Sequence, residues 1–364
     1  MTVTATSNLA SFFGSSPEDV KELFSSWGHK PYRAKQIAEW YFGKRFFSLD
    51  QMSDLPAALR AQLQEHFSWN FPDIVSSLDS PDGATKLLLK SDKNQMIETV
   101  ILRYENRTAL CVSSQVGCKL SCAFCQTGKL GFFRNLTTAE IIGQFALAET
   151  IVQKEGRTIT NVVFMGMGEP LDNFDPVVKA VKILISPDGF GLSHRKVTVS
   201  TSGLADKIRL LSEQTRVALA ISLHACRDEL RNELMPINRR FPLAVLKEAI
   251  QHYQRVTDTK ITFEYILIKD KNLGLREAKE LVQFLQGIPC KVNLIPFNSH
   301  PGLPFERPSP EAIDQFQRYM LDRGFVTTVR YSKGGDVSAA CGQLAAKDST
   351  NLDQIPRRKS VIGG

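Results

Sequence analysis

The chain has 364 residues, of which 43% are hydrophobic and 23% are charged, and its formal net charge is +7. This composition is typical of a globular protein with a large core, and the lack of any run of about 18 apolar residues excludes a helical membrane span. Residues 1–7 lack the charged flank and apolar stretch of a secretory signal, so we expect a cytoplasmic protein, with an organelle transit peptide as an open alternative.

The first 70 residues predict short helices. Ser16 and Pro17 form a helix start, and a second helix begins at Pro31. Basic residues 29–35 precede a mixed basic and aromatic run at 40–47, a combination that suits phosphate neutralisation and base stacking. The alternative is that Trp40 and its neighbour at helical spacing belong to the core. Residues 316–364, with eight Lys or Arg against four Asp, form a second basic region.

From residue 85 the pattern changes to strands and then to alternating strands and helices. We expect strands at 86–89, 99–102, 109–114, 161–165, 196–200, 217–222, 261–266 and 291–295, and helices at 138–153, 204–213, 275–287 and 310–323. The last six strands give about six βα units, too few for a closed eight-fold barrel. The sequence therefore predicts an α/β fold: a partial (βα)6 barrel with a small helical N-terminal domain and a short β extension.

Four domains follow from this pattern. We expect a helical RNA-binding accessory domain, a β-rich connector, the partial barrel, and a C-terminal loop with a basic tail; their ranges are 1–80, 81–108, 109–330 and 331–364. In a barrel of parallel strands the functional residues are expected in the loops that follow the strands.

Three cysteines follow the first barrel strand with the spacing C-x3-C-x2-C. Cys118, Cys122 and Cys125 can hold one iron–sulfur cluster, because thiolates are the usual ligands of such clusters. Three ligands leave one iron open for the amino and carboxylate groups of a substrate, as in catalytic metal sites. Structural zinc is the weaker alternative, because it prefers four ligands and the sequence has no second cysteine pair.

Polar residues and glycines follow three other strands. Residues 166–170 read Gly-Met-Gly-Glu-Pro, where the glycines would let a ligand approach the backbone and Glu169 could accept from an ammonium group. Ser200 and the run Ser222, Leu223 and His224 similarly follow apolar strands. Taken alone, each of these is more often a helix cap or a core histidine than a ligand.

These motifs together resemble the RlmN/Cfr family of radical S-adenosylmethionine RNA methyltransferases. The resemblance is close over residues 95–345 and is carried by segments 111–118, 118–125, 166–170, 200–203, 222–225, 294–298 and 339–344. It implies a 4Fe-4S cluster on the three motif cysteines. It also implies an S-adenosylmethionine site at Gly168, Glu169, Ser200, Ser222, Leu223, His224 and Asn298.

The resemblance further implies how the reaction proceeds. Cys341 would carry the methyl group, Cys111 would resolve a protein–RNA adduct through a transient disulfide with Cys341, and Glu98 would be the proton acceptor. Because C2 of adenine is electron-poor, this carbon cannot act as the nucleophile that attacks a methylsulfonium directly. Two S-adenosylmethionine molecules are then used per turnover, one to methylate Cys341 and one to form a 5′-deoxyadenosyl radical that activates the methyl. Cys226 and Cys290 match no role and are expected to be packing residues.

The implied substrates are an adenine of 23S rRNA at the peptidyl transferase centre and the adenine 3′ of the tRNA anticodon. The implied partners also include an electron donor such as flavodoxin or ferredoxin. We expect no membrane partner and a monomeric enzyme. Two alternatives stay open at this point: C8 methylation of the same rRNA adenine, and a non-enzymatic RNA-binding module with structural zinc.

Overall fold

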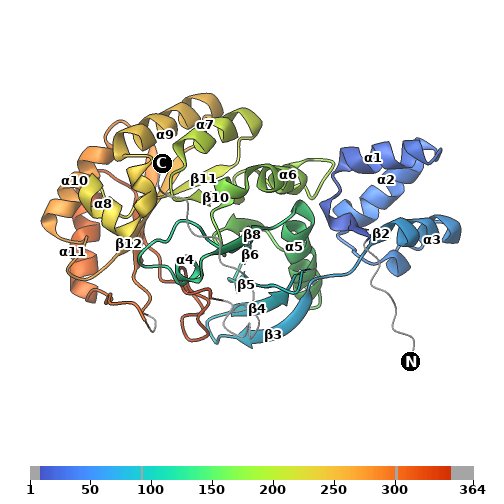
Figure 1. Cartoon of the computed structure of the whole chain (residues 1–364), viewed down its shortest axis with the longest axis horizontal. Helices are drawn as coiled ribbons and strands as arrows, with labels where there is room; N and C mark the ends of the chain where they lie inside the picture. Colours follow the sequence, from blue (N-terminus) through green and yellow to red (C-terminus); the bar gives the residue numbers. More distant parts are fainter. Residues whose placement is uncertain (1–8, 92, 300–301, 346–364) are drawn as a thin grey trace.

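The centre of the molecule is a mixed ten-stranded sheet (Figure 1). The computed structural model describes residues 9–91, 93–299 and 302–345. The parallel strands are β6 (Thr108–Cys111), β9 (Asn161–Phe164), β10 (Val197–Thr201), β11 (Ala218–Ser222), β12 (Ile261–Leu267), β13 (Cys290–Pro296) and β14 (Thr327–Val329). They lie side by side in chain order, with β14 at one edge of the sheet. The predicted partial barrel is confirmed, and β14 is a strand that the sequence pattern did not reveal.

Helices connect the parallel strands and cover the sheet (Figure 1). They are α5 (Thr138–Gln153), α6 (Phe174–Ile185), α7 (Ala205–Gln214), α8 (Asp228–Leu234), α9 (Leu243–Thr257), α10 (Leu275–Leu285) and α11 (Pro310–Leu321), with short 3-10 turns η4 (Pro170–Asn173) and η5 (Pro236–Arg239). Helix α5 starts where predicted because Thr137 and Glu140 form a reciprocal capping box. The crossover helices bury the apolar strands from solvent, as parallel sheets require.

Three antiparallel strands extend the sheet beyond β6. They are β5 (Met96–Arg103), β4 (Ala84–Lys90) and β3 (Asp73–Asp79), which forms the other edge. Strand β3 falls inside range 1–80 and pairs with β4 in the main sheet. A separate hairpin, β7 (Gln115–Gly117) with β8 (Phe132–Asn135), encloses the short helix α4 (Gln126–Leu130) and the motif cysteines.

The N-terminal unit lies against α5 and α6, at the far end of the molecule from α10 and α11 (Figure 1). It contains β1 (Ala10–Ser11), η1 (Phe12–Gly14), α1 (Pro17–Ser26), α2 (Pro31–Ala38), the π-turn η2 (Glu39–Gly43), η3 (Leu49–Gln51), α3 (Ala57–His66) and β2 (Phe67–Ser68). Its aromatic core includes Phe12 and Tyr41, both fully buried, whereas Trp40 stays partly exposed. Tyr41 therefore belongs to the core, and Trp40 packs against the core while remaining partly exposed, so base stacking by this run stays a prediction.

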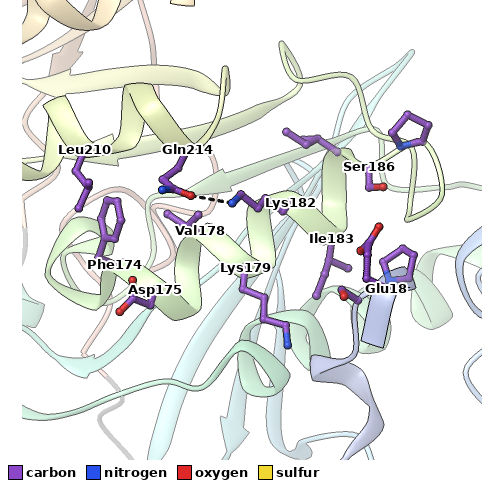
Figure 2. A pocket seen from close by; sticks show the side chains of 14 residues that line it. Glu18, Phe174, Asp175, Val178, Lys179, Lys182, Ile183, Ser186, Leu210 and Gln214 are labelled. Atoms are coloured by element: carbon purple, nitrogen blue, oxygen red, sulfur yellow. Dashed lines mark hydrogen bonds between the residues drawn. The ribbon is translucent and has the colours of Figure 1, made fainter. Parts of the chain in front are cut away.

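A groove lies between the start of α1 and helices α6 and α7 (Figure 2). Lys179 on α6 forms an ion pair with Asp19 at 2.6 Å, and Lys182 donates to Gln214 at 2.9 Å. Both lysines are engaged in these contacts. The groove therefore lies along the junction between the N-terminal unit and the barrel, and the ion pair of Lys179 with Asp19 crosses it.

The segment after β14 folds back over the barrel without regular secondary structure up to residue 345. Backbone N–H groups of Gly334 and Ala345 donate to Asp82 and Glu98, both at 2.7 Å, and Thr127 donates to Leu344 O at 2.7 Å. These bonds anchor the segment to the β extension and to α4. The basic tail beyond residue 345 lies outside the described residues. Within the described ranges, no helix combines the length and apolar character needed to cross a bilayer.

Candidate active site

The motif cysteines lie in the loop between β7 and α4, and all three line one cavity at the carboxyl ends of the barrel strands. The loop begins at Gly117, whose φ of 75° favours glycine, and a Cβ there would lie 1.9 Å from Gly131 O. Cys118 N–H donates to this same oxygen at 2.8 Å. The tight crossing of the two chain segments fixes the start of the loop whose three cysteines line the cavity.

The chemistry of these thiols fits an iron–sulfur cluster. Burial raises the pKa of Cys118, Cys122 and Cys125, that of Cys122 to about 12, so the thiols are protonated without metal. The positive charge of bound iron would remove these protons and leave thiolate ligands. Among the described residues, no three His, Cys, Asp or Glu side chains converge closely enough to hold a single metal ion. A cluster does not need such convergence, because its cysteines bind different iron atoms.

The Gly-Met-Gly-Glu-Pro turn forms the next wall of the cavity. A Cβ on Gly166 would lie 2.6 Å from Val112 O, and one on Gly168, whose φ is 102°, would lie 2.5 Å from the Gln115 side chain. The glycines are thus required by packing against the chain that follows β6, as well as by any ligand. Glu169 is buried and its two oxygens accept from Leu171 N and Ser202 N, so this carboxylate joins two strand-end loops.

Of the other residues of the implied cofactor site, some line the cavity and some do not. Ser200, Ser222 and His224 line the cavity together with Gly168 and Glu169. Leu223 is fully buried and Asn298 donates to Ser332 Oγ at 3.1 Å, and neither side chain lines this cavity. The structure therefore brings most, and not all, of the implied set together.

His224 has a fixed protonation state. Its φ of 59° turns the chain at the end of β11, and its Nδ1 accepts from Ile266 N–H at 3.0 Å. Because Nδ1 is the acceptor, the ring proton belongs on Nε2. Burial lowers the pKa of His224 to about 3, with the Arg231 guanidinium adding to the effect. The imidazole is therefore neutral at physiological pH.

Cys341 connects this cavity to a second one. It lines the cavity of the motif cysteines, and together with Met165 it also lines a cavity that contains Cys111 and Arg330. Burial raises the pKa of Cys111 to about 12, and Arg330 opposes that shift. Two thiols 230 residues apart in sequence thus share one space, as the resemblance implies.

The structure does not support a disulfide between these two thiols. Cys111 and Cys341 are both free, and no disulfide is present among the described cysteines. The expected pair is therefore adjacent and reduced in the state that the structure describes.

Glu98 lies in β5, next to the site and outside both cavities. It is buried, forms an ion pair with Lys86 at 3.1 Å, and accepts from Ala345 N at 2.7 Å. The carboxylate thus contacts the same C-terminal segment that carries Cys341.

Sequence reasoning missed three charged residues near the site: Arg231 and Glu264, which are buried, and Arg330, which is half-buried. Arg231 on α8 donates to Leu223 O, Ser202 O and Ser222 O and so ties the loops after β10 and β11 together. Arg330 follows β14, which was itself overlooked. Glu264 lies in the middle of apolar strand β12, and a lone carboxylate in such a strand is a signal that could have been used.

Family comparisons agree with this site. Residues 112–285 match the model of the radical SAM superfamily, and residues 10–68 match that of the ribosomal RNA large subunit methyltransferase N-terminal domain. Radical SAM proteins use a 4Fe-4S cluster and S-adenosylmethionine, which suits the three cysteines and the cavity that they line.

Curated relatives and a solved structure cover nearly the whole chain. A dual-specificity RNA methyltransferase RlmN from Marinomonas sp. (strain MWYL1) is 46% identical over 94% of this chain and 95% of its own length. A protein of the same name from Anaeromyxobacter sp. (strain Fw109-5) is 45% identical over 90% of this chain and 88% of its own. The crystal structure of a radical SAM methyltransferase from Sphaerobacter thermophilus is 41% identical, with a TM-score of 0.88 over 93% of this chain and all of that one.

These matches remove the alternative of a non-enzymatic zinc module. The radical SAM match, the matching N-terminal domain and the methyltransferase relatives identify the chain as an enzyme. This protein belongs to the RlmN family of radical SAM methyltransferases.

Proposed function

We propose that this enzyme methylates C2 of an adenine in 23S rRNA at the peptidyl transferase centre and C2 of the adenine 3′ of the tRNA anticodon. The observation that carries the proposal is the position of Cys341, which lines both the cavity of the motif cysteines and the cavity of Cys111. A thiol placed there can receive a methyl group in one cavity and be attacked by a second thiol in the other. The relatives' name, dual-specificity RNA methyltransferase, supports RNA as the substrate.

The cofactors are assigned to the first cavity. Cys118, Cys122 and Cys125 would hold the cluster, which when bound supplies the electron that cleaves S-adenosylmethionine to a carbon radical. Gly168, Glu169, Ser200, Ser222 and His224 line the remaining walls, and Leu223 and Asn298 complete the set at positions that match the family. Two S-adenosylmethionine molecules would be used per turnover, one for the methyl group and one for the radical.

The two thiols would act in sequence. Cys341 attacks the methyl carbon of S-adenosylmethionine, forming an S–C bond while the sulfonium leaves as a thioether. After hydrogen abstraction the methylene radical would add to C2 of adenine, and the adduct would lose the C2 proton to Glu98 and one electron to the oxidised cluster, which leaves Cys341 linked to RNA by a closed-shell thioether. Cys111 then attacks the Cys341 sulfur, forming an S–S bond as the S–C bond breaks and its electron pair passes to the base. Both thiols are free in the structure, so we expect that bond to form during turnover and a thiol reductant to reduce it afterwards.

Glu98 would accept the proton that the base loses. Its carboxylate is buried, and Lys86 and Ala345 N–H hold it in place. Since Ala345 occupies one carboxylate oxygen, we expect the C-terminal segment to shift when RNA enters, so that the base replaces this contact.

The remaining assignments concern partners and location. The exposed residues Lys30, Tyr32 and Lys35 of the N-terminal unit would bind RNA. An electron donor of the flavodoxin or ferredoxin class would reduce the cluster. The proposed chemistry needs no residue from a second chain, so we expect a monomer, and the reducing chemistry supports a cytoplasmic location.

The product tests this proposal directly. Reconstituted enzyme, S-adenosylmethionine and a reductant are incubated with 23S rRNA or tRNA, the RNA is digested to nucleosides, and the methylated adenosine is identified by mass spectrometry against standards. The proposal predicts 2-methyladenosine from both RNAs. Formation of 8-methyladenosine would replace it with the C8 reaction, and methyl groups on rRNA alone would contradict the tRNA assignment.

A further inference from the structure

Glu264 is a buried carboxylate at the cofactor cavity that none of the roles described above uses. It lies in β12, where Phe263 and Tyr265 pack toward Phe284 of α10 and Phe316 of α11. Side chains alternate along a strand, so Glu264 points to the opposite face, where it and Ile266 line the cavity. A charged side chain that is only 4% exposed is rare unless it has a binding partner.

One oxygen of this carboxylate is held by the protein and the other is not. Thr328 donates to Asn293 Oδ1 at 2.7 Å, which fixes the amide so that Asn293 Nδ2 donates to Glu264 Oε1 at 3.0 Å. The second oxygen, Oε2, is buried and accepts no hydrogen bond from the described residues. An unsatisfied buried acceptor costs free energy, and a donor that arrives with a ligand would remove that cost.

The position of Glu264 indicates which part of the ligand it would meet. The motif cysteines and Glu169 lie on the side of the cavity formed by β7, β9 and β10, where the amino and carboxylate groups of S-adenosylmethionine would bind the open iron. Glu264 lies two strands further along the sheet, in register with Ser222 on one side and Asn293 on the other. A ligand anchored at the cysteines would therefore extend its nucleoside toward Glu264.

We propose that Glu264 Oε2 accepts a hydrogen bond from a ribose hydroxyl of bound S-adenosylmethionine, and so positions the 5′ carbon between the cluster and Cys341. Carboxylates that follow or interrupt parallel strands bind ribose hydroxyls in other nucleotide sites for the same reason, the strength of a charged acceptor. The inference rests on the proposed function, because it requires S-adenosylmethionine in this cavity.

Binding measurements test the inference without RNA. Cluster-loaded enzyme is titrated anaerobically with S-adenosylmethionine, with analogues that lack the 2′- or the 3′-hydroxyl, and with an analogue that lacks the adenine amino group. The wild-type protein should bind one of the two deoxy analogues about 10- to 100-fold more weakly than S-adenosylmethionine, as expected for a hydrogen bond to a charged group. Glu264→Met should bind S-adenosylmethionine weakly by a similar factor and no longer distinguish that deoxy analogue.

Two further variants separate binding from folding. Glu264→Gln keeps an oxygen for Asn293 Nδ2 and presents an amide N–H donor to the cavity in place of the acceptor Oε2, so it should unfold at the wild-type temperature and still bind S-adenosylmethionine more weakly. Glu280→Gln, on α10 and outside the cavity, should bind all ligands as the wild type does.

Three results would overturn the inference. In the first, the wild-type protein binds both deoxy analogues as tightly as S-adenosylmethionine. In the second, Glu264→Met discriminates against a deoxy analogue as strongly as the wild type does. In the third, the effect of Glu264→Met depends only on the adenine amino group of the ligand. If the wild-type protein failed to bind S-adenosylmethionine at all, the proposed function itself would be wrong.

Discussion

Two thiols from distant parts of the chain meet at the end of the barrel, and each has a separate predicted effect. Cys341 is the proposed methyl acceptor, so Cys341→Ala leaves S-adenosylmethionine with no nucleophile. We expect methyl transfer to RNA to fall below detection while the iron–sulfur absorbance stays at the wild-type level. Methylated RNA from this variant would contradict the role of Cys341.

Loss of Cys111 should block a later step, the release of RNA from Cys341. Cys111→Ala should still form the bond between Cys341 and RNA and then fail to break it, so a protein–RNA adduct should accumulate and run as a slower band on a denaturing gel. Cys290→Ala, a change outside both cavities, serves as the matched control and should turn over normally. Free methylated RNA from Cys111→Ala would argue against a resolving thiol.

His224 should make the protein sensitive to acid. Its pKa is near 3 in the folded protein and 6.5 in the unfolded chain, so the unfolded chain binds the extra proton first as the pH falls. Between pH 7 and pH 5 this should lower the free energy of unfolding by about 2 kcal/mol. His224→Asn suits the left-handed backbone and cannot titrate. Urea unfolding at both pH values should show a smaller loss for this variant, and an equal loss would contradict the prediction.

The sequence could predict residues whose chemistry is unusual for their position. The spacing of Cys118, Cys122 and Cys125 was sufficient to predict a cluster site. The motif indicates Gly166 and Gly168 as positions where a ligand can approach the backbone. The structure shows that the same glycines are also needed for packing against Val112 and Gln115. Contacts between distant segments of this kind leave no local pattern in one sequence.

At the scale of elements, the strand ends depend on one buried arginine. Arg231 is fully buried and donates to carbonyl oxygens of the loops after β10 and β11 and to Asn238 Oδ1. Arg231→Met should leave these acceptors unpaired and lower the free energy of unfolding by about 3 kcal/mol or more. It should also weaken S-adenosylmethionine binding, because Ser202 and Ser222 would shift.

A surface arginine provides the control for this prediction. Arg209 lies on α7 in an exposed ion pair with Glu248, and Arg209→Met should change the free energy of unfolding by less than about 1 kcal/mol. Denaturant titration of both variants measures the difference. Equal stabilities would show that Arg231 does not hold the strand ends.

Long periodic elements were predictable and short ones were not. Helix α5 has a capping box and sixteen residues, and its range was predicted correctly. Strand β14 has three residues, and the hairpin of β7 and β8 has strands of three and four, too short for a period to emerge. These short strands flank the loop of the motif cysteines and precede Arg330, so the elements that were missed lie close to the candidate site.

At the scale of the whole molecule, the N-terminal unit and the barrel would bind different parts of the RNA. Lys30 and Lys35 are exposed on the N-terminal unit and do not line the cavity of the motif cysteines. The double variant Lys30→Ala/Lys35→Ala should weaken RNA binding and reduce the slope of log affinity against log salt by about 1 to 2. Lys279→Ala, on exposed α10 at the far end of the molecule, should leave both quantities unchanged (Figure 1). An unchanged slope in the double variant would exclude these lysines as phosphate contacts.

The central claim is that the methyl carbon reaches adenine as a radical, through Cys341. Because one hydrogen is removed from the methyl group before it bonds to the base, S-adenosylmethionine with a CD3 group should give 2-methyladenosine that carries two deuterium atoms. Mass spectrometry of digested RNA measures this directly, and Cys341→Ala should give no labelled product. A methyl group that retains all three deuterium atoms would show direct transfer and contradict the account.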